Sequence, residues 1–204
     1  MLDFVGVGDL HMDGKLRKYI PNLNPLILAE AERVLSYAKR NGIKLVVFYG
    51  DICEYTVMSQ EAQILLLSFL MANPHFSFIF LLGNHDTENA EHHSMQMFVE
   101  MLKHGMLPHV RIIEKPTTLF RKSGTPLRLL PWPSLDTKSD CLNVIHEEVY
   151  GAAWDGGRLV SSEAKVKDIC VAGHLHTHQK VGRVNYSGTL YQTSFGEKAE
   201  KYFH

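Results

Sequence analysis

Residues 4–11 read Phe-Val-Gly-Val-Gly-Asp-Leu-His, and this stretch contains the first of several strand-end motifs in the chain. Its apolar run ends at Gly8-Asp9, which predicts a buried strand with a carboxylate at its end. Downstream, Asn24-Pro25 is typical of a helix start, because asparagine caps helices and proline fits the first turn. Residues 44–49 form a second apolar run, which ends at Gly50-Asp51. This strand–helix–strand order favours two parallel strands joined by a crossover helix.

The remaining chain divides into a helical part and a strand-rich part. Residues 76–82 predict a third strand, which ends at Gly83-Asn84-His85-Asp86. A helical stripe over residues 95–102 follows and is closed by Gly105. Beyond that glycine the apolar runs are short and strand-like, with little helix between them. Strand–helix units followed by strands predict an α/β sandwich of two sheets flanked by helices.

Residues 59–72 predict a helix that is apolar on nearly all of its faces. Such a helix packs either inside the core or in an interface between copies of the chain. The sequence supports both interpretations equally.

The composition is that of a globular protein in a reducing compartment. The 204 residues, 45% of them hydrophobic, are enough for one domain with a sizeable core. The formal net charge of −1 excludes a general basic surplus, so any nucleic-acid binding must rest on a local patch. Three widely spaced cysteines suit the cytosol better than a disulfide framework. We see no leader peptide and no membrane-spanning run, so the sequence predicts a soluble cytoplasmic protein.

One sequence pattern recurs along the chain. A predicted apolar strand ends close to a glycine, and a residue of a type that binds metals follows. A single Gly-Asp pair is a common turn, but the ordered repetition is hard to produce by chance. Because the carboxyl ends of parallel strands gather at one edge of a sheet, these residues are expected to converge. The positions are Gly8-Asp9-Leu10-His11, Gly50-Asp51, Gly83-Asn84-His85-Asp86, His146 (without a glycine) and Gly173-His174-Leu175-His176.

The residue types in these motifs suit a metal site. Carboxylate, carboxamide and imidazole together favour divalent cations such as Mn²⁺, Fe²⁺ or Zn²⁺, and no cysteine takes part. Asp9 and His11 are two residues apart on extended backbone, so their side chains point the same way, as do those of His174 and His176. There are enough ligands for two metals, and a shared carboxylate holds such a pair roughly 3.5–4 Å apart.

The ordered set Gly-Asp-Leu-His, Gly-Asp, Gly-Asn-His-Asp, a lone His and Gly-His-Leu-His resembles the calcineurin-like metallophosphoesterase superfamily. The resemblance runs from Asp9 to Glu197. It implies a four-layer α/β/β/α sandwich with mixed sheets and a centre of two divalent metal ions. By that resemblance the first metal is held by Asp9, His11 and His176, the second by Asn84, His146 and His174, and Asp51 bridges them.

The same resemblance implies two catalytic residues that do not bind metal. His85 would sit over the site and protonate the leaving oxygen or stabilise the phosphate charge. Asp86 would orient His85, as carboxylates often orient a working imidazole. A hydroxide, made available because the metals lower the pKa of water, would attack phosphorus.

Several stretches point to one branch of the superfamily. Pro131-Trp132-Pro133, residues 144–152 around His146, and the segment 168–176 with Gln179 soon after resemble the nuclease subunit of the SbcCD complex and its relatives. The segment 186–197, Tyr-Ser-Gly-Thr-Leu-Tyr-Gln-Thr-Ser-Phe-Gly-Glu, is the most telling. Trp132 as an ordinary core aromatic and the last segment as an ordinary hairpin are the plainer interpretation. The resemblance implies a DNA exonuclease or endonuclease in end processing, repair or recombination, with Mn²⁺ the expected metal and Mg²⁺, Fe²⁺ or Zn²⁺ the alternatives.

The family's further regions and partners are expectations as well. Those nucleases continue into a capping domain and helices that dock on an SMC-like ATPase, whereas this sequence stops at His204. We therefore expect a single nuclease domain over residues 1–204, either a compact stand-alone form or a core, in a bacterial or phage-infected cytosol. The relatives form homodimers through the helices after the second motif, where residues 59–72 lie.

Basic residues near the motifs are candidates for contact with DNA. Lys15, Arg17 and Lys18 directly follow the first metal motif and could reach a phosphate backbone. A solvated loop is an equally good interpretation of each. No base-reading motif is visible, which suits cleavage without strong sequence preference. Further candidates are Arg121, Lys122, Lys180 and Arg183.

Two other functions compete with a DNA nuclease. The first is a phosphodiesterase acting on cyclic nucleotides or other small molecules, or a protein phosphatase, because the same metals serve all of these. Residues 186–197 and the segment around His146 favour the nuclease. The second is a non-catalytic scaffold, which should have lost ligands or the general acid, whereas every such position is filled here.

Overall fold

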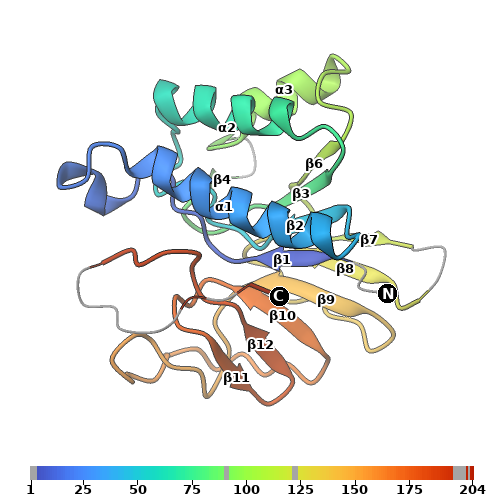
Figure 1. Cartoon of the computed structure of the whole chain (residues 1–204). Helices are drawn as coiled ribbons and strands as arrows, with labels where there is room; N and C mark the ends of the chain where they lie inside the picture. The colour runs from blue at the N-terminus through green and yellow to red at the C-terminus, as the bar shows by residue number, and fades with distance from the viewer. Residues whose placement is uncertain (1–3, 90–91, 121–123, 195–200, 202) are drawn as a thin grey trace.

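The computed structural model describes residues 4–89, 92–120, 124–194, 201 and 203–204. Two sheets lie one above the other, and the helices cover the outer face of the first (Figure 1). A small antiparallel pair, β4 (Thr87–Asn89) with β5 (His92–His93), follows the third strand and was not predicted. The α/β class and the two-sheet arrangement are confirmed.

The first sheet is parallel throughout, as the strand–helix–strand pattern predicts. Its order is β1-β2-β3-β6, and its strands are apolar because both faces are covered. No helix within the described ranges is both long and apolar enough to cross a membrane. The strands are β1 (Val5–Val7), β2 (Leu45–Phe48), β3 (Ser77–Leu81) and β6 (Val110–Ile113); the helices are the 3₁₀ helix η1 (Lys15–Lys18), α1 (Leu23–Arg40), α2 (Gln60–Ala72) and α3 (Gln96–Lys103).

The second sheet is mixed and contains six strands in the order β11-β12-β10-β9-β8-β7. Its central strands β8, β9, β10 and β12 are mutually parallel, and an antiparallel strand lies at each edge. The strands are β7 (Thr117–Leu119), β8 (Leu127–Leu130), β9 (Leu142–His146), β10 (Cys170–Gly173), β11 (Gln179–Val181) and β12 (Val184–Tyr186).

Alternate residues along a strand of the second sheet pack into different layers. Leu129 packs between the two sheets with Val47 and Ile79, whereas Leu130 packs in a separate cluster with Val149. This alternation follows from the two-residue period of a strand. In the described part of the chain, the far face of this sheet is covered by the irregular segment after β9. A loop therefore takes the place of the outer helix layer that the four-layer expectation includes.

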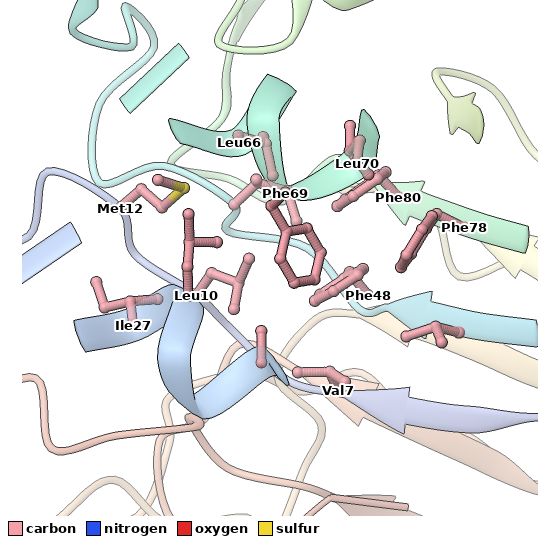
Figure 2. Packing of buried hydrophobic residues seen from close by; sticks show 14 of the residues in the cluster. Val7, Leu10, Met12, Ile27, Phe48, Leu66, Phe69, Leu70, Phe78 and Phe80 are labelled. Carbon is pink, nitrogen blue, oxygen red and sulfur yellow. The ribbon is translucent and has the colours of Figure 1, made fainter. Parts of the chain in front are cut away.

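The main core lies between the first sheet and its helices, as Figure 2 shows. Phe48 and Phe80 stack with their ring centroids 4.6 Å apart and an interplanar angle of 4°. Phe78 extends the same stack, and Leu66 and Leu70 of α2 close it from above. Each fully buried side chain of this size contributes about 1.5–3 kcal/mol.

Helix α2 has one buried face and one exposed face, although its sequence is apolar nearly all round. Ser59 caps it by accepting a hydrogen bond from the Ala62 N–H. Leu66 is fully buried, so the core interpretation holds for that face. Ile64 and Met71 are 56% and 64% exposed on the other side. The outer face therefore remains available for contact with another chain.

The first helix begins earlier than the sequence predicts. It starts at Leu23 with Asn22 at the N-cap, and Asn24 does not cap it. The Asn24 amide instead pairs with Asp13, accepting from its backbone N–H at 2.7 Å and donating to its carboxylate at 2.9 Å. Asn24 thus links the helix to the loop after β1, a long-range contact that a local capping pattern cannot reveal.

Replacing Leu66 by alanine should lower the free energy of unfolding by about 2–5 kcal/mol, because a cavity would open beneath α2. Ile64→Ala, on the exposed face of the same helix, should change it by less than about 0.5 kcal/mol. Urea denaturation of both variants measures this. Equal effects would contradict the assignment of the two faces.

Candidate metal centre

The carboxyl ends of the parallel strands in both sheets meet at one edge of the sandwich. His146, the last residue of β9, donates from Nδ1 to the carbonyl oxygen of Tyr49 at the end of β2, at 2.7 Å. The backbone N–H of His174, after β10, lies 3.1 Å from both carboxylate oxygens of Asp9, after β1. These contacts bring all seven sequence-predicted ligands to one region: Asp9, His11, Asp51, Asn84, His146, His174 and His176.

Asp9, His11 and His176 form the first donor group, with one ligand atom of each within 4.8 Å of the others. The Nε2 atoms of His11 and His176 are 3.0 Å apart. Thr193 Oγ1 lies 2.9 Å from Nδ1 of His176. Because the hydroxyl can accept the Nδ1 proton, the Nε2 lone pair of His176 is left for a cation.

The second donor group contains Asp51, His146 and His174, joined by Asn84. Nδ1 of His146 carries a proton, because it faces the Tyr49 carbonyl. Its Nε2 lies 3.1 Å from Asn84 Oδ1 and 3.2 Å from Asp51 Oδ1, and His174 Nδ1 lies 2.8 Å from the same Asn84 oxygen. Electron-rich atoms so arranged need a shared proton or a cation between them. This donor set fits a divalent metal.

Asp51 lies between the two groups. Its Oδ1 faces His146 at 3.2 Å, and its Oδ2 lies 3.7 Å from Nε2 of His11. The side chain is 1% exposed. The Asp51 carboxylate therefore faces both donor groups, one oxygen toward each.

The glycines in the motifs leave room for the ligands. A Cβ on Gly83 would lie 2.1 Å from Asp51 Oδ1 and 2.7 Å from His146 Nε2. One on Gly50, whose φ is +115°, would lie 2.2 Å from Nδ1 of His146. Backbone and ligand atoms approach so closely that only glycine fits. This explains why a glycine accompanies the strand ends in the sequence.

The buried donors perturb one another. Burial disfavours the charged form of Asp51, but the neighbouring His146 outweighs it and lowers the pKa of that carboxyl below its usual range. Burial likewise opposes the charged form of His146, yet Asp51 raises the pKa of this imidazole to about 10. Burial, together with His146, lowers the pKa of His174 to about 3, so His174 is neutral, the form that binds metals.

His85 lies over the first donor group, with its ring centroid 5.0 Å from that of His11. Its backbone N–H donates to Asp51 Oδ1 at 2.9 Å. Its Nδ1 lies 2.9 Å from the carbonyl oxygen of Glu54, so this nitrogen carries a proton. The side chain is 32% exposed.

The prediction that Asp86 contacts and orients the ring of His85 is wrong. Asp86 is fully buried, and its carboxylate accepts hydrogen bonds from three backbone N–H groups and a hydroxyl. These oxygens are occupied by neighbouring loops, and the ring of His85 is held by the Glu54 carbonyl instead. Asp86 therefore ties together the two loops that carry Asp51 and Asn84. Its donors are Gly83 N, Ile52 N, Cys53 N and Ser94 Oγ, at 2.9, 3.1, 3.0 and 2.7 Å.

Glu54 belongs to the site and was missed in the sequence. It is 6% exposed, with Oε2 at 3.0 Å from Nδ1 of His11, a short contact that is not aligned as a hydrogen bond. Its Oε1 lies 3.1 Å from Lys15 Nζ and 3.8 Å from His85 Nδ1. Burial opposes its charge, but His11 lowers the pKa of the carboxyl to about 2. The only sequence signal was a carboxylate three residues after Asp51.

Trp154 borders the second group and was also missed. Its ring meets that of His174 edge to face, with centroids 5.4 Å apart. The Gln179 side chain holds the adjacent Ala153 by accepting from its N–H at 2.9 Å and donating to its carbonyl at 2.7 Å. The sequence had singled out Gln179, but not the tryptophan that it helps to position.

The three basic residues after the first motif differ in their surroundings. Lys15 is 71% exposed and reaches the centre through its contact with the carboxylate described above. Arg17 is bound by the carboxylates of Asp13 and Glu61, so it is a structural link between loops. Lys18 lies over the ring of its neighbour Tyr19. Lys15 and Lys18 remain candidates for contact with phosphate, and Arg17 is a weaker one.

The other basic candidates gain no support. Arg183 precedes β12, which runs parallel to β10, so it lies at the amino ends of these strands, away from the centre. Lys180 lies in the middle of the edge strand β11. Arg121 and Lys122 lie outside the described residues, as does part of the segment 186–197.

Comparison with known proteins agrees with this geometry. A model of the family described as calcineurin-like phosphoesterase matches residues 2–186. The chain is also 24% identical, over 187 residues, to exonuclease subunit 1 of Enterobacteria phage T4. The match covers 82% of this chain and 53% of that protein, so the chain spans about half the length of this relative.

Glu54→Gln should weaken Mn²⁺ binding roughly 10- to 100-fold, because the carboxylate 3.0 Å from Nδ1 raises the basicity of the ligating His11. Isothermal titration calorimetry with Mn²⁺ measures this. Glu30→Gln, which removes an exposed carboxylate on α1, is the control and should bind as the unchanged chain does. Unaltered affinity in Glu54→Gln would show that Glu54 does not support His11.

Proposed function

Because the chain belongs to the calcineurin-like phosphoesterase family, we propose that it is a metal-dependent nuclease that hydrolyses phosphodiester bonds in DNA. The observation that carries the proposal is the pair of donor groups, which meet at Asp51 beneath His85. Similarity to a phage protein named exonuclease subunit 1 supports a nucleic acid over other phosphoesters, and DNA is the substrate in our proposal. A role in DNA end processing, repair or recombination is part of the proposal.

The metals of this family would be held by the residues that converge here. Two divalent ions, Mn²⁺ in our proposal, would neutralise phosphate charge and lower the pKa of water. The first would be held by Asp9, His11 and His176, the second by Asn84, His146 and His174, with Asp51 shared.

His85 is proposed as the general acid. The Glu54 carbonyl holds Nδ1, so the protonated ring presents its second proton from Nε2, on the partly exposed side. Proton donation to the leaving oxygen of a DNA strand from this atom would contribute about 10²–10⁴-fold in rate. Asp86 contributes indirectly, because it fixes the loops that position Asp51 and His85.

The chain's partners follow from the same proposal. The similar phage protein is named as a subunit, which supports a second protein component for this chain, in our proposal an SMC-like ATPase. The exposed side of α2, with Ile64 and Met71, offers an apolar surface for a homodimer. Lys15 and Lys18 are proposed to contact the phosphate backbone of DNA.

His85→Ala should lower the turnover of DNA by about 10²–10⁴-fold and leave Mn²⁺ binding intact. The turnover of bis-p-nitrophenyl phosphate by this variant should fall much less, because p-nitrophenolate leaves without needing a proton. End-labelled single- and double-stranded DNA, assayed with Mn²⁺ beside the small diester, measures both and also gives the polarity of cleavage.

His75→Ala, an exposed histidine away from the centre, is the control and should keep full activity. Normal DNA cleavage by the His85→Ala variant would show that His85 is not the general acid. Turnover of the small diester by the unchanged chain, with DNA left untouched, would contradict the nuclease and favour a small-molecule phosphodiesterase.

A further inference from the structure

A cavity of about 450 Å³ adjoins the candidate metal centre. Its walls come from the loop after β1 and the loop after β2. Lys15 belongs to both the cavity and the centre, because its Nζ lies 3.1 Å from the Glu54 carboxylate that also contacts His11. The volume is in the range of small-molecule sites and large enough for a nucleoside.

The walls of this cavity are held in place by a buried carboxylate. Asp13, 8% exposed, accepts hydrogen bonds from the backbone N–H and the hydroxyl of Ser59, both at 2.8 Å. It also binds Arg17 at 2.6 Å and the Asn24 amide at 2.9 Å. These bonds join the two loops and the starts of α1 and α2, so the cavity is preorganised.

Charge in and around the cavity is balanced. Lys15, Arg17 and Lys18 supply three cations, and Asp13, Glu54 and Glu61 supply three carboxylates that bind two of them. Recognition by phosphate charge alone is therefore weak here. An uncharged part of the ligand would therefore have to add to the affinity at this cavity.

The cavity wall offers the surface for that part. Tyr55, which directly follows Glu54, is 53% exposed, and Val57 is 79% exposed. Single exposed apolar residues are ordinary, but these two line one cavity beside the metal centre. Stacking of a base on an aromatic ring contributes about 1–3 kcal/mol.

We infer that this cavity is a nucleoside subsite, in which Tyr55 stacks on the base of a nucleotide adjoining the phosphodiester that is cleaved. The inference rests on the proposed nuclease function and adds a base contact to it. Lys15 lies between the subsite and the centre, where the phosphate joining the two would pass.

The test uses DNA strands with one abasic residue placed at successive positions from the end. Binding is measured by fluorescence anisotropy with the His85→Ala chain and Mn²⁺, so that the strands stay intact. An abasic residue at one position should weaken binding about 5- to 140-fold, the factor that corresponds to one stacked base. Adding Tyr55→Ala should weaken binding of the intact strand by the same factor and abolish the sensitivity at that position. Tyr55→Phe should restore it.

Tyr150→Ala is the matched control, because Tyr150 is 62% exposed and does not line the cavity. If Tyr55→Ala keeps the affinity for intact strands and the same abasic sensitivity, the subsite is refuted while the nuclease stands. If the unchanged chain hydrolyses bis-p-nitrophenyl phosphate but neither binds nor cuts DNA, the proposed function fails, and the subsite fails with it.

Discussion

The hydrogen bond from Nδ1 of His146 to the carbonyl oxygen of Tyr49, 2.7 Å long, is the interaction on which the centre depends. It joins the end of β9 in the second sheet to the end of β2 in the first. It also fixes the orientation of the His146 ring, so that Nε2 faces Asp51 and Asn84. Gly50 must be a glycine for this bond to form, because a Cβ there would overlap the imidazole. One contact thus aligns the two sheets and orients a ligand.

The same arrangement gathers buried charge that the fold must compensate. Asp9 and Asp51 are at most 1% exposed, and each lies near at least two histidines. Taking such groups out of water costs several kcal/mol each unless partners or metals satisfy them. A cation that binds the folded chain would therefore stabilise the fold as well as supply the chemistry. The backbone bonds to Asp86 and Asp13 hold the surrounding loops while this charge is accommodated.

The sequence predicted the site residues that follow strand ends, but it was uninformative about residues whose position depends on packing between distant loops. Asp9, Asp51, Asn84 and His174 each follow an apolar strand, and parallel topology brings such ends together. Glu54 left almost no signal, because its partners His11 and Lys15 come from another loop. For the same reason the partner of Asp86 was misassigned: a buried carboxylate binds whichever N–H groups surround it. The covering of the second sheet by a loop depends equally on long-range packing.

Two cations are proposed to share Asp51. Electron paramagnetic resonance during a Mn²⁺ titration tests it most directly, because two Mn²⁺ ions bridged by one carboxylate give a coupled signal unlike that of isolated ions. We expect two Mn²⁺ to bind per chain with a coupled spectrum, and we expect Asp51→Asn to lose the coupling. A single isolated Mn²⁺ per chain, or a coupled pair that is unaffected by Asp51→Asn, would contradict the proposal.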